Sequence, residues 1–186
     1  GLRMQWPAAA TLTDPRVPIV FAGAGVASDA TVPNGSSLDR VAPTVSEILG
    51  FEREHPEVRS GTAVAGIANG EPSSLVLLVG WKGVGSSELE NHPQDWPFLS
   101  SLRDDGAGTL EGETGSLPID PAAMLTTVGT GGLPSQHGIT GSFIRDGQGE
   151  VVEAFRPDLP AEDRQIIATL ADVLDDAPHL AHASIR

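Results

Sequence analysis

The sequence lacks cysteine entirely and contains a single lysine, Lys82. Without cysteine the chain forms no disulfide, no thiolate metal site and no cysteine nucleophile, although this leaves its redox compartment open. Basic residues are also scarce, because 11 Lys and Arg face 25 Asp and Glu, for a net charge of -14. Such a surplus of negative charge repels DNA, RNA and anionic membrane surfaces, so we expect none of these as partners.

Long hydrophobic runs are absent as well. The longest strongly apolar run, Leu75 to Val79, is far too short to cross a bilayer. The first residues show no charged start followed by an apolar stretch, so no signal peptide is predicted. We therefore expect a soluble protein, and the cytoplasm is the favoured location. A hydrophobic content of 39% over 186 residues is typical of one globular domain, which we place at residues 1–186.

Apolar runs and helical patterns alternate along the chain. Residues 17–22 and 74–80 read as strands because they are apolar and bounded by glycine, and residues 107–112, after Gly106, are a further strand candidate. Helical spacing, caps and turn residues predict helices at 43–49, 95–103, 121–128 and 161–176, and a β-hairpin near 139–155. This alternation favours a layered α/β fold with a mostly parallel sheet flanked by helices. In that sheet the strands at 17–22 and 75–79 should be neighbours or near neighbours.

Five segments of the chain carry a resemblance to a known family: VPIVFAGAGV (Val17 to Val26), APTVSEILGF (Ala42 to Phe51), LVLLVGWKGV (Leu75 to Val84), LPSQHGITGSFIRDGQGEVVEAF (Leu133 to Phe155) and TLADVLDDA (Thr169 to Ala177). Together they resemble the alkaline phosphatase superfamily, in its type I phosphodiesterase/nucleotide pyrophosphatase branch. The first two are similar to a strand and helix found late in the family, and the others to its early segments. In this chain the late-type segments (residues 17–50) therefore come before the early-type segments (residues 74–177), which is the reverse of the family's order. Such a rotated order is expected of a permuted, shortened relative or of part of a larger tandem protein.

The resemblance also implies where the catalytic residues should lie. The family's metal-binding aspartate falls on Lys82, and its nucleophilic Thr or Ser falls on Pro121, beside Asp120. A proline has no hydroxyl to act as nucleophile, and a lysine repels the metal ions that the family's chemistry requires. We therefore predict no catalytic residue, no bound metal and no other cofactor in this chain.

Lys82 and Pro121 are instead candidate anion-binding positions. An ammonium at Lys82 would replace part of the metal's charge, and the helix that begins at Pro121 would add backbone donors for a phosphate or carboxylate. Asp120 opposes this site with its own charge, and a solvated lysine in a loop is the ordinary alternative. The partners left open are a small anionic ligand, another protein and a second copy of the chain.

Other polar motifs have simpler interpretations. Residues 23–28 follow a dinucleotide fingerprint superficially, but loop-forming residues come next, which favours a turn. His179 and His182 are predicted to be surface residues rather than metal ligands, because a third ligand is missing. His137 reads as part of a structural turn and Asp120 as a helix cap. No nucleophile-elbow sequence supports a serine hydrolase.

These observations favour a catalytically degenerate domain of this family with a binding, structural or assembly role. The alternative is part of an active metal-dependent phosphoesterase whose missing ligands come from another chain or segment. A small-molecule enzyme unrelated to phosphate chemistry has only the α/β pattern in its favour.

Overall fold

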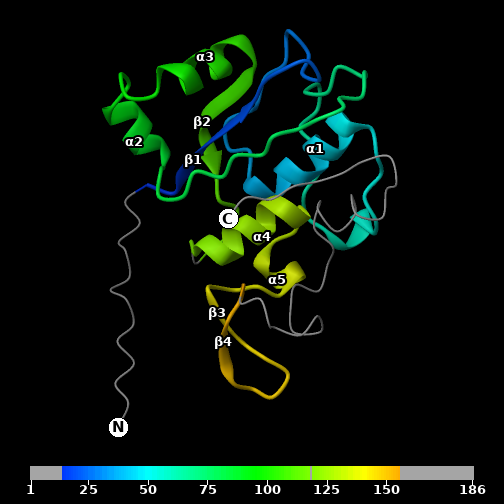
Figure 1. Cartoon of the computed structure of the whole chain (residues 1–186), viewed down its shortest axis with the longest axis vertical. Coiled ribbons are helices and arrows are strands. Elements are labelled where there is room, and N and C mark those ends of the chain that lie inside the picture. Colours follow the sequence, from blue (N-terminus) through cyan, green and yellow to red (C-terminus); the bar gives the residue numbers. More distant parts are fainter. Residues whose placement is uncertain (1–13, 118, 156–186) are drawn as a thin grey trace.

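The computed structural model describes residues 14–117 and 119–155 of the chain (Figure 1). Its elements are β1 (Arg16–Phe21), η1 (Leu38–Arg40), α1 (Val41–Leu49), η2 (Pro56–Val58), α2 (Ser86–Asn91), α3 (Pro97–Asp105), β2 (Ala107–Glu113), α4 (Pro121–Thr130), α5 (Pro134–His137), β3 (Phe143–Arg145) and β4 (Val151–Glu153). Helices and strands are mixed along the chain, as expected. The helix predicted at 161–176 lies outside the described residues.

The strands of the described residues form two small antiparallel sheets. β1 pairs with β2 in a register that runs from Arg16 opposite Glu113 to Phe21 opposite Ala107, and β3 pairs with β4 as a hairpin. The register of β1 shifts between Val17 and Ile19, on either side of a proline that has no N–H to donate to the ladder. The hairpin near 139–155 is therefore confirmed, whereas a mostly parallel sheet is not found in the described part of the chain.

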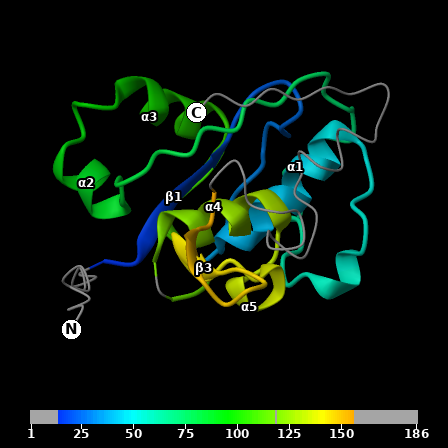
Figure 2. The same ribbon diagram turned by 60° about the horizontal axis from the view of Figure 1, so that its bottom comes forward.

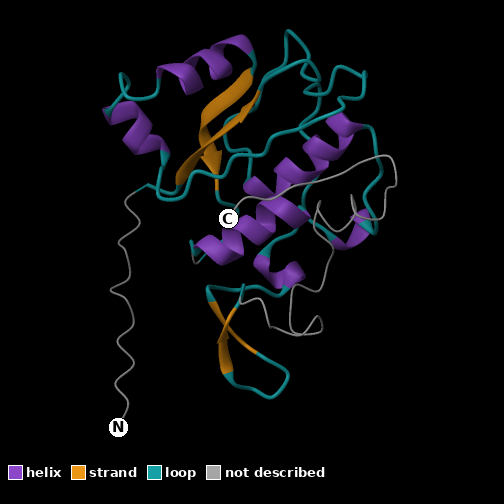
Figure 3. Cartoon of the chain, viewed as in Figure 1, coloured by secondary structure: helices purple, strands orange, loops and turns teal. Residues whose placement is uncertain are grey.

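The segment at 75–79 is the largest departure from the predicted fold. It forms no strand, and Figure 3 shows the long connection from α1 to α2 mainly as loop. The side chains of Leu75 and Leu77 are 80% and 83% exposed. The prediction that this segment neighbours β1 in one parallel sheet is wrong for the described structure. An apolar run becomes a central strand only when strands pair with both its edges, and no described strand pairs with it.

The main hydrophobic core lies between the β1–β2 pair, α1 and the connection that follows α1. Its buried members are Ile19, Phe21, Val32, Val41, Val45, Ile48, Val64, Ile67 and Ala107. The helix predicted at 43–49 is confirmed as α1. It ends at Gly50, whose φ of 74° is a left-handed conformation that glycine adopts without strain. The core is thus built mainly from the N-terminal half of the chain.

A second layer is formed by α4, α5 and the hairpin. Figures 1 and 2 show α4 beside α1, with the hairpin on the far side of α4. The buried side chains of Ala122, Ile139 and Ala154 join α4 to the hairpin, and Ile144 packs against them. The helix predicted at 121–128 is confirmed as α4. This layer positions both Asp120 and His137.

The region of α2 and α3 differs in detail from the prediction. α3 begins at Pro97 with Trp96 at its N-cap, and the side chain of Asp95 does not cap it. Phe98 in α3 is 74% exposed, whereas the ring of Trp96 is buried and its indole donates to the carbonyl of Leu89 at 2.7 Å. The sequence does not predict α2.

The strand predicted at 107–112 is confirmed as β2. None of the helices in the described residues has the length and hydrophobicity that a bilayer crossing requires.

Candidate functional site

The N-terminus of α4 is held by the carboxylate of Asp120. Its Oδ1 accepts hydrogen bonds from the backbone N–H of Ala122 and from the hydroxyl of Ser142, each at 2.9 Å. Proline at position 121 fits the first turn because its missing N–H would have no partner there. Asp120 is therefore a helix cap, as the sequence predicts, and it also ties α4 to the start of the hairpin.

The charge state of Asp120 follows from these contacts. Burial alone would raise its pKa, but hydrogen bonds from Ser142 and from the first backbone N–H groups of α4 outweigh burial, so the pKa is lowered. Asp120 is consequently an anion near neutral pH. Its negative charge lies directly at the helix end that would otherwise attract a phosphate or carboxylate.

Lys82 lies in a turn with Gly83, on the segment that leads into α2. Its side chain is exposed, and it forms no ion pair or hydrogen bond with any described residue. Two residues earlier the backbone passes close to α4: a Cβ atom at Gly80 would lie 3.3 Å from Cδ2 of Leu125. The structure thus brings the segment of Lys82 to α4, about one turn from Pro121, although not at the end of a strand as expected.

His137 is fully buried beneath α4. Its Nδ1 accepts the backbone N–H of Ile139 at 3.1 Å, and its Nε2 lies 3.1 Å from the hydroxyl of Thr127. In the neutral ring the proton must then be on Nε2, which donates to Thr127. Burial lowers the pKa of His137 to about 4. A side chain with no exposed surface cannot touch a substrate, which supports the structural role predicted for it.

A buried polar cluster near the other end of α4 was missed by the sequence analysis. The carboxylate of Asp39 in η1 accepts hydrogen bonds from the hydroxyls of Ser37 and Ser60, the latter at 2.6 Å. Gly61 packs so closely here that a Cβ atom would overlap the carbonyls of Asp39 and Gly131. These contacts join segments far apart in the sequence, so no local pattern could reveal them.

Arg53 completes the packing at the C-terminal end of α4. Its guanidinium donates to the carbonyl oxygens of Gly61 at 3.2 Å and Thr130 at 3.4 Å. A cation at a helix C-terminus is favourable, just as the carboxylate of Asp120 is at the N-terminus. α4 is therefore stabilised electrostatically at both ends.

The family comparison bears on this site. The model of the family described as type I phosphodiesterase / nucleotide pyrophosphatase matches residues 76–182, more than half of the chain. The chain belongs to this family. The matched range includes Lys82, Pro121 and His137, whereas the late-segment resemblance at residues 17–50 lies outside it and stays a prediction. Curated proteins and solved structures gave no significant match.

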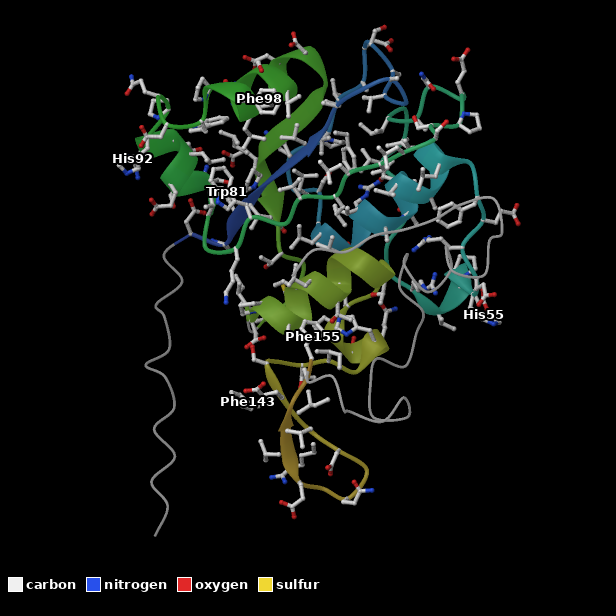
Figure 4. All side chains as sticks on the ribbon, in the orientation of Figure 1. His55, Trp81, His92, Phe98, Phe143 and Phe155 are labelled. Atoms are coloured by element: carbon white, nitrogen blue, oxygen red, sulfur yellow. The ribbon has the colours of Figure 1, made fainter. Side chains whose placement is uncertain are left out.

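The metal ions that the resemblance to this phosphodiesterase family implies do not fit the residues that are present. By the resemblance, Lys82 falls where a metal ligand is expected and Pro121 where the nucleophile is expected, and the carboxylate of Asp120 already accepts two hydrogen bonds. No group of three or more His, Asp or Glu side chains within residues 14–117 and 119–155 is arranged to hold a metal. His55 and His92 lie on opposite sides of the molecule (Figure 4). His179 and His182 lie outside the described residues.

Proposed function

We propose that this chain is a catalytically degenerate type I phosphodiesterase/nucleotide pyrophosphatase domain with a binding, structural or assembly role. One feature of the sequence supports the proposal: the family resemblance assigns the metal-binding aspartate to the position of Lys82 and the nucleophile to that of Pro121. A phosphoester hydrolase of this kind needs an oxygen nucleophile and a cation to activate it. Proline supplies no hydroxyl, and the ammonium of lysine repels the cation.

The binding role that we propose for the site is weak capture of a small anion by Lys82, beside the first turn of α4 at Pro121. Two observations support it: Lys82 has no partner among the described residues, and its segment runs close to α4 at Leu125. Asp120 works against it, because its carboxylate already holds the first N–H groups of α4. We therefore expect dissociation constants in the millimolar range, about 4 kcal/mol of binding free energy.

Titration with inorganic phosphate and with a nucleoside monophosphate tests this binding role. Followed by amide NMR shifts, wild type should saturate at millimolar ligand, with shifts at the turn of Lys82 and in the first turn of α4. Lys82→Ala should lose this response. The control Arg145→Ala removes an exposed cation on the hairpin, whose guanidinium donates to the carbonyl of Gly149, and should bind as wild type does. Equal binding by Lys82→Ala, or no binding by wild type, contradicts the role.

An active phosphoesterase is the second candidate, and family membership itself favours it. In that case the metal ligands and the nucleophile come from another chain or segment, as the positions of Lys82 and Pro121 require. The two candidates differ in one measurable property, which is metal-dependent hydrolysis by the intact chain.

A further inference from the structure

An exposed row of large apolar side chains crosses the segment between α1 and α2. We call Leu75, Leu77, Val79 and Trp81 the apolar stripe; their side chains are 80%, 83%, 73% and 58% exposed. Val76, between the first two, packs against the main core instead. Leu78, between Leu77 and Val79, is also 49% exposed, so this segment turns most of its apolar side chains outward.

The surroundings of the apolar stripe make it an interaction surface. Leu125 of α4 is 51% exposed and lies next to Gly80, so the apolar area continues onto that helix. Residues 74–84 form no backbone hydrogen bond with any described residue. Contiguous apolar patches on a protein surface mark places where another segment or molecule packs. The apolar stripe thus calls for a complementary apolar face.

The sequence after Phe155 contains such a face. Its 31 residues lie outside the described part of the chain, and their pattern predicts a helix at 161–176. The apolar side chains that fall on one face of that helix are Ile166, Ile167, Leu170, Val173 and Leu174. The family match, over residues 76–182, includes this segment and every residue of the stripe except Leu75. We propose that residues 156–182 cover the apolar stripe, with this helical face against it.

Length and charge both fit this assignment. The ten residues from 156 to 165 can span up to about 35 Å when extended, on the order of the diameter of a domain of this size. Residues 72–87 contain no Asp or Glu, although the whole chain has a net charge of -14, and Lys82 adjoins the stripe. Residues 161–176 carry five carboxylates and one arginine. The stripe therefore offers this acidic segment a surface free of like charge.

Cysteine cross-linking in the 186-residue chain tests the proposal, since this sequence contains no cysteine that would interfere. Leu77→Cys combined with Leu170→Cys should give an intramolecular cross-link with a short bismaleimide. Two control pairs should cross-link at least fivefold less: Leu77→Cys with Ala168→Cys, on the opposite helical face, and Val151→Cys with Leu170→Cys, on the exposed hairpin. Equal yields in all pairs, no cross-link in the first, or a cross-linked dimer would each overturn the proposal. The dimer would assign the stripe to a second copy of the chain.

A second measurement leaves the stripe itself unchanged. In a Trp6→Phe background the fluorescence comes from Trp81 and the buried Trp96. Leu170→Glu should expose Trp81 and raise its quenching by acrylamide about twofold, whereas Ala168→Glu should not change it. If acrylamide already quenches Trp81 fully in the Trp6→Phe protein, before any substitution at Leu170, the proposal is overturned.

Discussion

At the scale of single residues, His137 is the clearest case of a side chain whose environment decides its role. Its ring is neutral and fully buried, and both of its nitrogens have partners, the backbone N–H of Ile139 and the hydroxyl of Thr127. A proton added to Nδ1 would face an N–H that already donates to that nitrogen. Protonation of His137 therefore destabilises the folded state.

This destabilisation predicts a pH dependence of stability. The folded pKa of His137 is lowered to about 4, below the value of about 6.5 in an unfolded chain. The unfolded state therefore binds more protons between these values. The stabilisation is complete above pH 6.5 and is lost as the pH falls toward 4. We expect the free energy of unfolding to fall by about 2 kcal/mol from pH 7.5 to pH 5 on account of this residue.

Urea unfolding of wild type and of His137→Gln at both pH values measures the effect. The variant should be less stable at pH 7.5, and the difference between the two proteins should shrink by about 2 kcal/mol at pH 5. Comparing the two proteins removes the contribution of the carboxylates, which both contain. A constant difference would mean that His137 does not titrate in this way.

At the scale of elements, Asp120 connects α4 with the hairpin. Because its carboxylate caps the helix and also accepts from Ser142, Asp120→Ala should lower the free energy of unfolding by about 1–2 kcal/mol. Ser142→Ala should cost about 1 kcal/mol or less, since it removes only the contact with the hairpin. Chemical denaturation at neutral pH measures both.

Asp95 supplies the matched control. It precedes a helix in the sequence just as Asp120 does, but α3 has no side-chain cap and Asp95 is exposed. Asp95→Ala should therefore change stability by less than about 0.5 kcal/mol. A loss as large as that of Asp120→Ala would contradict the capping that the structure assigns.

The sequence predicts the elements whose signals are local. Pro43 in the first turn and Gly50 after the last turn predict α1, the cap at Asp120 and the proline that follows it predict the start of α4, and turn residues predict the hairpin. The prediction of a central strand at 75–79 is wrong because hydrophobicity indicates only that a segment tends to be covered. It does not indicate which other segment covers it. Strand pairing and the cluster around Asp39 depend on segments distant in the sequence, which local patterns do not encode.

At the scale of the whole molecule, the candidate site was predicted only in part. Sequence motifs placed Lys82 and Pro121 and anticipated Asp120 as a cap and His137 as structural. They did not show that the Lys82 segment passes α4 as a loop. The family match covers 76–182, so it accounts for the layer of α4 and the hairpin, while β1 and α1 lie outside it.

The central claim is that this family member has lost its catalytic chemistry, and hydrolysis by the intact chain tests it most directly. The measurement is release of p-nitrophenol from bis(p-nitrophenyl) phosphate and p-nitrophenyl phosphate by the purified 186-residue chain, with Zn²⁺ or Mn²⁺ and with EDTA. The account predicts that no rate exceeds that of buffer with the same metal, because Lys82 and Pro121 supply neither ligand nor nucleophile. Turnover that requires the metal and disappears with EDTA would contradict it.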